Sequence, residues 1–126
     1  MSERNGYEPG VPCWVAAVEP DPDAAARFYT ELFGWTVNAD NPLGYRQIHT
    51  QSKEGIQGGI WPAPPQSPDF VQLFIAVDDV KTAVSRAEAL GAKMLIPPTV
   101  LPAGDEMAVL MDPQGMSFAV CRQPGV

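Results

Sequence analysis

Positive charge is scarce in this sequence, and the scarcity argues against nucleic acid as a partner. The 126 residues include 8 Lys and Arg against 15 Asp and Glu, which gives a formal net charge of −7. Proteins that bind nucleic acid cluster their Lys and Arg into a basic patch, whereas these eight are scattered. We therefore interpret the acidity as a source of solubility and expect no nucleic-acid partner.

Long apolar runs and cysteines are also few. No run approaches the roughly 18 apolar residues of a membrane span, and the polar start MSERNGYEPG lacks the apolar core of a signal peptide. We expect no membrane partner and a cytoplasmic location. Cys13 and Cys121, near the two chain ends, fit reduced thiols in that compartment, with a bridge between them as the alternative.

Proline is abundant, with 14 residues that fall mainly at segment edges, as in EPDPD, WPAPPQSPD and LIPPTVLP. Apolar runs between these edges predict short strands, and helical apolar spacing predicts two helices. Module one, residues 11–61, is predicted as a strand at 13–19, a helix at 21–34 and strands at 35–40, 45–51 and 55–61. A proline-rich linker at 62–69 follows.

Module two, residues 70–122, repeats this order of elements. It is predicted as a strand at 70–77, a helix at 78–91 and strands at 92–98, 106–112 and 116–121. The two halves superpose at an offset of 58, which sets Asp21 on Asp79 and Leu32 on Leu90. Neither βαβββ module can bury both faces of its sheet alone, so we expect a single domain of paired modules over residues 1–126.

The most informative stretch is RFYTELFGW at 27–35. Its residues Phe28, Tyr29, Leu32 and Phe33 form one apolar face of an amphipathic helix, which ends at Gly34. Together with the preceding DPDAAA it resembles the vicinal oxygen chelate superfamily, which contains glyoxalase I, extradiol dioxygenases, fosfomycin-modifying enzymes and bleomycin-binding resistance proteins. VDDVKTAVSRAEALGAKMLIPP and VLMDPQGMSFAV resemble the same superfamily, so the resemblance covers residues 11–122.

Three shorter motifs narrow the resemblance. CW at 13–14, LFGW and DPQG are similar to a hydroxylase-like subgroup that often occurs in actinomycete secondary metabolism. The resemblance implies an α+β fold in which two βαβββ modules form a curled eight-stranded mixed sheet around a cavity, with the helices on the outer face. Members of this length often dimerise, so a homodimer is expected.

Metal-using members of the superfamily hold a divalent ion in that cavity with His, Gln or Glu. Carried over by register, the ligand positions are Trp14, Gln72 and Ala119. Trp and Ala offer no lone pair suited to a divalent cation, and Gln72 alone is a weak neutral ligand. We therefore expect no metal and no cofactor.

Strand alternation selects the residues expected to face the cavity. Trp14, Ala16 and Val18 face inward from the first strand, while Val15 and Ala17 face the first helix. The predicted ligand-binding residues are Trp14, Ala16, His49, Trp61, Gln72, Phe74, Met107, Val109 and Ala119, with Ala76, Met111 and Ser117 as further inward positions. Such a mostly apolar, aromatic lining suits a small organic ligand; in the alternative, Trp14 and Phe74 simply fill the space.

Catalytic groups are harder to assign. His49 shares a strand face with Tyr45 and Gln47, opposite Ile48, and is either a general base in the cavity or a solvent-side residue. Tyr45 and Gln72 are the other candidates, although an amide cannot take up a proton at neutral pH. Gly58-Gly59 lacks the pattern of a phosphate loop and indicates close backbone approach in a strand. Cys13 is expected to point away from the cavity.

The leading hypothesis is metal-independent binding of a small aromatic molecule, such as sequestration of a natural product or antibiotic. The alternative is a superfamily enzyme, a lyase, isomerase or hydroxylase-like catalyst, that uses His49, Tyr45 or Gln72 for proton handling. A third hypothesis is an accessory module with a vestigial cavity.

Overall fold

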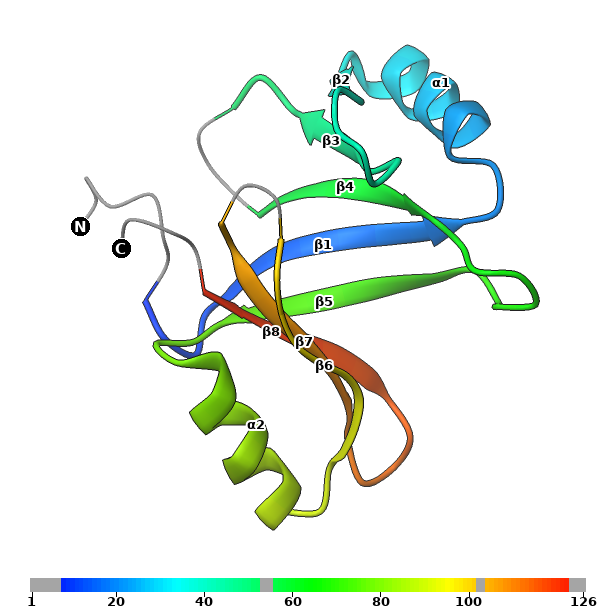
Figure 1. Cartoon of the computed structure of the whole chain (residues 1–126). Helices are drawn as coiled ribbons and strands as arrows, with labels where there is room; N and C mark the ends of the chain where they lie inside the picture. Colours follow the sequence, from blue (N-terminus) through cyan, green and yellow to red (C-terminus); the bar gives the residue numbers. More distant parts are fainter. Residues whose placement is uncertain (1–7, 53–55, 102–103, 123–126) are drawn as a thin grey trace. The chain divides into compact units, whose positions relative to one another are not determined.

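The computed structural model describes residues 8–52, 56–101 and 104–122, which form two helices and eight strands (Figure 1). Module one contains β1 (Pro12–Glu19), α1 (Pro22–Phe33), β2 (Thr36–Asn38), β3 (Arg46–His49) and β4 (Gln57–Pro62). Module two contains β5 (Phe70–Ala76), α2 (Val80–Ala89), β6 (Lys93–Val100), β7 (Glu106–Met111) and β8 (Ser117–Arg122). The predicted α+β class with two βαβββ modules is confirmed.

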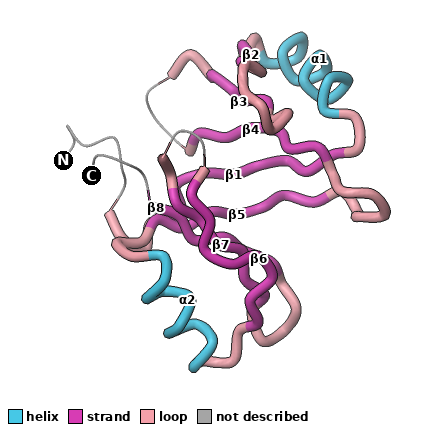
Figure 2. The backbone as a smooth tube through the Cα atoms, in the orientation of Figure 1, coloured by secondary structure: helices cyan, strands magenta, loops and turns pink. Residues whose placement is uncertain are grey.

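The two modules share one strand topology. In module one the strands lie in the order β2-β3-β4-β1, with β1 parallel to β4 and the other neighbours antiparallel. Module two has the matching order β6-β7-β8-β5, with β5 parallel to β8. Figure 2 shows the helices, strands and loops along the backbone. The sheet is therefore mixed in both modules, and the repeated order of elements seen in the sequence is also a repeat of topology.

Both predicted helices are present: α1 lies within one residue of its predicted bounds, and α2 is two residues shorter than predicted at each end. The side chains of Asp21 and Asp79 accept hydrogen bonds from the backbone N–H groups of Ala24 and Thr82, each at 3.1 Å, and so cap the two N-termini. Such a cap stabilises a helix by about 1 kcal/mol. Gly34 ends α1 with φ of 75°, a left-handed conformation that glycine adopts without strain. Within the described ranges, no helix is long and apolar enough to cross a membrane.

Each helix covers one face of its own sheet. Under α1 the buried side chains are Ala25, Ile48 and Ile60, joined by Ala17, Ala26, Tyr29, Trp35 and Val37. Under α2 they are Val80, Val84, Ala108, Leu110 and Val120, joined by Val77, Ala83, Ala87 and Phe118. Because side chains alternate along a strand, these two cores fix which residues lie on the opposite face of each sheet.

The apolar face predicted for α1 is only partly buried. Tyr29 packs on the sheet, but Phe28, Leu32 and Phe33 are 59%, 58% and 56% exposed. The side chains that meet the sheet from α1 are instead Ala25, Ala26 and Tyr29, and Ala25 and Tyr29 are one helical turn apart. Phe28 and Leu32 form a second pair at the same spacing and lie on the flank of the helix. Together with Phe33 they form an exposed apolar patch on α1.

The chain divides into two compact units, and the divisions fall inside β1 and β5. One unit is Trp14–Gln72, and the other joins the segment up to Cys13 with the chain from Leu73 onward. In the second unit, Gly10 N–H donates to Ala76 O at 2.8 Å and Ala76 N–H donates to Val11 O at 3.0 Å. With φ of 87° at Gly10, this is the hydrogen bonding of a β-bulge with glycine at its first position. Residues 10–13 thereby extend the sheet of module two at β5.

Candidate functional site

The face of module one opposite α1 is built from β1, β4 and β3. Trp14, Ala16 and Val18 pair with Gln57, Gly59 and Trp61, and Gly59 pairs in turn with Gln47. The same register sets Tyr45 opposite Trp61 and His49 opposite Gln57. We call this set the distal face of module one: Trp14, Ala16, Val18, Tyr45, Gln47, His49, Gln57, Gly59 and Trp61. The predicted alternation is confirmed, because Ala17, Ile48 and Ile60 pack on the α1 side.

Three aromatic side chains meet on this face. The indole Nε1 of Trp14 lies 2.5 Å from the hydroxyl oxygen of Tyr45. The ring of Tyr45 lies 4.5 Å from that of Trp61 between centroids, with the planes tilted by 39°. Trp14, Tyr45 and Trp61, the aromatic trio, therefore form one contact group from three strands or their ends. The sequence places these residues on one face but carries no signal for the bond between Trp14 and Tyr45.

The trio depends on the glycine at the centre of the face. A Cβ added to Gly59 would lie 2.0 Å from the Tyr45 hydroxyl oxygen, so only a residue without a side chain lets the phenol cross β4 to reach Trp14. A Cβ on Gly58 would lie 2.4 Å from the backbone oxygen of Val15. The prediction that Gly58-Gly59 marks close approach is confirmed, with a side chain above Gly59 and backbone beside Gly58.

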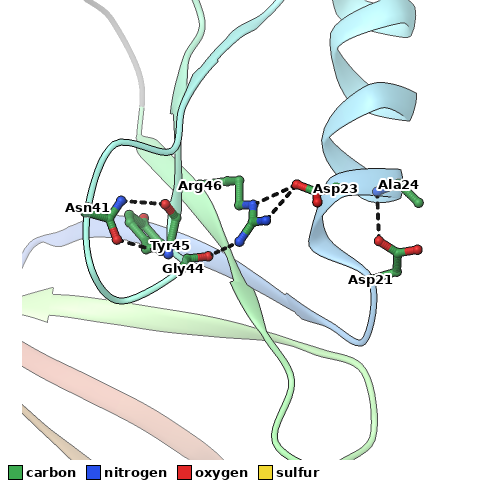
Figure 3. Close-up of polar contacts among 7 residues, drawn as sticks. All are labelled: Asp21, Asp23, Ala24, Asn41, Gly44, Tyr45 and Arg46. Atoms are coloured by element: carbon green, nitrogen blue, oxygen red, sulfur yellow. Dashed lines mark hydrogen bonds and ion pairs between the residues drawn. The ribbon is translucent and has the colours of Figure 1, made fainter.

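A turn anchored by Asn41 holds Tyr45 in place (Figure 3). The Asn41 amide nitrogen donates to Tyr45 O at 2.7 Å, and its oxygen accepts from the N–H groups of Leu43 and Tyr45 at 3.0 and 3.2 Å. Asn favours such local bonds to nearby backbone. Asn41 is a positioning residue that the sequence analysis did not identify.

Arg46 ties the start of β3 to α1. Its guanidinium donates to the Asp23 carboxylate, with Nη2 at 2.6 Å and Nε at 3.1 Å from the same oxygen, and also to the Gly44 carbonyl (Figure 3). Asp23 is 68% exposed at its side chain, so the pair adds modestly to stability. The ion pair holds the Arg46 side chain on the α1 side of the sheet, and Tyr45, the preceding residue, lies on the distal face.

Burial raises the pKa of the Tyr45 phenol, and the hydrogen bond from Trp14 only partly opposes the shift. A phenol already titrates near pH 10, so Tyr45 stays neutral throughout the physiological range. This makes Tyr45 unsuited to act as a general base. It is suited to donate or accept a hydrogen bond.

His49 lies at the other end of the distal face. It is exposed and pairs with Thr36 on β2. It lies four positions after Tyr45, or about 13 Å along a strand, so Tyr45 directly precedes β3 and His49 is its last residue. Its register places it beside Gln57, which is itself the partner of Trp14.

The matching face of module two, opposite α2, is apolar and closely packed. Phe74 pairs with Ala119, and Ala119 pairs with Val109. These three are 8%, 0% and 7% exposed. Met107 pairs with Cys121 on the same side, and Met111 with Ser117. In β7 and β8 the side chains of Ala108, Leu110 and Val120 pack under α2, so strand alternation sets Met107, Val109 and Ala119 on the opposite face.

Cys13 does not point where the sequence analysis placed it. Its sulfur lies 3.5 Å from that of Cys121 and 3.7 Å from Phe74 O, on the side of module two opposite α2. The cause is that residues 10–13 pair with β5 instead of completing module one. Both cysteines are free thiols. The hydrogen bond between the two thiols lowers the pKa of Cys13, against the effect of burial, and the same bond together with burial raises the pKa of Cys121.

The donor set does not fit the divalent metal of the superfamily. Of the three ligand positions carried over from the superfamily, Trp14 and Ala119 have no lone pair that could bind a metal ion. Gln72, 6% exposed, offers only a neutral amide oxygen. Among the residues that the structure describes, no three His, Cys, Asp or Glu lie close enough together to hold a metal ion.

Comparisons with known proteins agree with this architecture. A Mycobacterium tuberculosis protein named "Putative glyoxylase CFP32" is 33% identical over 95% of the chain, and the anthracycline biosynthesis protein DnrV of Streptomyces peucetius is 30% identical over 93%. The chain spans about half of these relatives, 48% of each.

Solved structures share the fold at low identity. Streptomyces coelicolor methylmalonyl-CoA epimerase superposes with a TM-score of 0.66 at 16% identity, covering 94% of this chain and 98% of the epimerase. A hypothetical protein of Bacillus halodurans superposes with a TM-score of 0.69 at 14% identity, covering 93% and 96%. The model of the glyoxalase-like domain matches residues 14–121. The chain therefore belongs to the glyoxalase-like domain family.

Proposed function

We propose that this domain binds a small aromatic organic molecule, without a metal, on the distal face of module one. The observation that carries the proposal is the aromatic trio. Trp14 occupies the position where metal-using members of the superfamily place a ligand, and it is bonded to Tyr45, which lies against Trp61. Aromatic faces attract flat ligands by stacking, and the Tyr45 hydroxyl adds a polar group among them.

The relatives support a polycyclic ligand. Two of them, from Streptomyces peucetius and Streptomyces sp., are named anthracycline biosynthesis proteins, and anthracyclines are fused-ring aromatic compounds. We propose on the same grounds that the domain acts in secondary metabolism and belongs to the hydroxylase-like subgroup. Sequestration of such a compound in the cytoplasm would protect the cell that makes or meets it.

Tryptophan fluorescence tests the proposal with an internal control. The chain has three tryptophans; Trp14 and Trp61 belong to the trio, whereas Trp35 packs on the α1 side against Tyr29 and Phe33 at 5.8 and 5.0 Å. In Trp35→Phe, a bound fused-ring compound is expected to quench the remaining emission as in the wild type. In Trp14→Phe/Trp61→Phe the quenching should be largely lost.

Affinity and metal dependence complete the test. Trp61→Leu should weaken binding roughly threefold to tenfold, the size of an aromatic contact, in calorimetric titration. Dialysis against EDTA should leave affinity unchanged. The proposal fails if a panel of neutral and charged fused-ring compounds gives neither quenching nor a rise in melting temperature.

The enzymatic alternative rests on one observation, the place of His49 on the same face, beside Gln57. In that case the domain would act as a lyase, isomerase or hydroxylase-like catalyst with His49 handling a proton. Turnover of any substrate found should then fall in His49→Ala and change its pH profile. Unchanged turnover in His49→Ala/Gln72→Ala would remove both residues from the mechanism.

We also propose that the chain forms a homodimer through the exposed patch of Phe28, Leu32 and Phe33. More than half of each of these side chains is exposed, and such contiguous apolar surface marks interaction sites. Light scattering should give a dimer for the wild type and a monomer for Leu32→Glu, with Leu90→Glu as a control on α2.

A further inference from the structure

The hydrogen bond between Trp14 and Tyr45 has only one possible direction. An indole N–H is a donor and has no acceptor lone pair, whereas a phenol can both donate and accept. Trp14 Nε1 must therefore donate, and the Tyr45 oxygen at 2.5 Å must accept. The hydrogen of the Tyr45 hydroxyl then points away from Trp14, and it is the donor that this side chain has to offer.

The hydroxyl lies over the middle of the distal face. It crosses above Gly59, whose neighbour on β1 is Ala16, 0% exposed. Trp14 lies two residues before Ala16 on β1, and Trp61 lies two residues after Gly59 on β4, so the two indole rings flank the Ala16–Gly59 pair. A flat ligand stacked on the trio would therefore meet the hydroxyl near its own ring edge, where substituents are carried.

The chemistry of the surroundings favours a neutral acceptor. The cation nearest in sequence, Arg46, is engaged with Asp23 on the α1 side, and the net charge of −7 repels anions. The phenol also keeps its proton, because burial raises the pKa of Tyr45. A carbonyl oxygen attached to the ring system meets these conditions better than a carboxylate or a phosphate does.

We propose that Tyr45 is the polar anchor of the site and selects fused aromatic ligands that carry a neutral carbonyl oxygen, that is, quinones and aryl ketones. This inference rests on the proposed function, and it adds the class of ligand. Tyr45 acts here as a hydrogen-bond donor whose oxygen is already bonded by Trp14.

A matched pair of probes tests the inference. 2-(Hydroxymethyl)anthraquinone and 2-(hydroxymethyl)anthracene share ring number and side chain and differ in the ring carbonyls. The wild type should bind the quinone roughly threefold to tenfold more tightly than the hydrocarbon, the effect of one added hydrogen bond. Tyr45→Phe should abolish that preference, while Tyr29→Phe, on the α1 side, should retain it.

Two further measurements separate a lost donor from a disturbed fold. Trp14→Phe keeps the Tyr45 hydroxyl and should preserve the preference for the quinone, even if both affinities fall. The preference should also be equal at pH 6 and pH 9, because the phenol remains protonated.

Each outcome decides the matter. Equal binding of the two probes by the wild type, or a preference that survives in Tyr45→Phe, overturns the inference and leaves the proposed function standing. Binding of neither probe overturns the inference, and the proposed function falls with it if the wider panel of fused-ring compounds also gives no binding.

Discussion

Replacing Gly59 with alanine is the sharpest test of the aromatic trio. The added Cβ would lie 2.0 Å from the Tyr45 hydroxyl oxygen and 2.2 Å from Cζ, whereas non-bonded atoms pack favourably at about 3.5–4.0 Å. The phenol must therefore move by roughly 1.5 Å. That displacement breaks its bond to Trp14, which is 2.5 Å long, and separates its ring from Trp61.

The expected loss of stability follows from these terms. Overpacking lowers the free energy of unfolding by about 1–3 kcal/mol, and the lost hydrogen bond lowers it by about 1 kcal/mol. The lower conformational entropy of the unfolded chain raises it by about 0.4–1 kcal/mol. We expect Gly59→Ala to lower the free energy of unfolding by about 1–3 kcal/mol in urea titration. For a chain of this size that corresponds to a fall in melting temperature of roughly 5–10 °C.

A double-mutant cycle identifies the cause. In a Tyr45→Leu background the phenol is gone, so Gly59→Ala should then cost under about 0.5 kcal/mol. Gly58→Ala is the matched control, because its added Cβ would meet the Val15 backbone at 2.4 Å, and its cost should be the same in both backgrounds. If the cost of Gly59→Ala were undiminished in Tyr45→Leu, the assignment of the trio would be refuted.

Three further outcomes are expected. Asn41→Ala removes the bonds that hold Tyr45, so it should lower stability by about 1 kcal/mol and weaken ligand binding in calorimetry. The sulfur of Cys121 is hydrogen-bonded to that of Cys13, and this bond together with burial raises the pKa of Cys121. Iodoacetamide at pH 8 should therefore label Cys121 slowly in the folded chain and rapidly in urea, as measured by intact mass; equal rates would contradict this. The pKa of Asp112 is lowered by hydrogen bonds from Met116 and Gln114. Its stabilising effect should be present well above pH 3.8 and be lost as pH falls below that value; Asp112→Asn, compared by urea titration, should show a weaker acid dependence.

The elements and the facing of their residues could be predicted because they depend on local chemistry. Asp21 and Gly34 bound α1 through capping bonds and a left-handed turn, and both signals lie within a few residues of the helix. Alternation placed Trp14 and His49 on one face because the side-chain period of a strand is fixed.

The arrangement of the site depends on register, which the sequence does not display. The bond from Trp14 to Tyr45 requires that β1, β4 and β3 align so that Gly59 falls between the two rings. The exposure of Phe28 and Leu32 depends on the angle at which α1 meets the sheet, and apolar spacing alone did not show that Ala25 and Tyr29 are the contact pair. The sulfur contact of Cys13 depends on which sheet residues 10–13 join.

The pairing of residues 10–13 with β5 has a consequence for dissecting the protein. A fragment beginning at Phe70 would contain all five elements of module two, yet it would lack the segment whose backbone bonds to Ala76 and the thiol that meets Cys121. Its β5 would be an unpaired edge strand, whose free backbone N–H and C=O groups can pair with another chain and promote aggregation. The proline segment at 62–69 is therefore a border in sequence alone, and an expressed module two needs residues 10–13 joined to it.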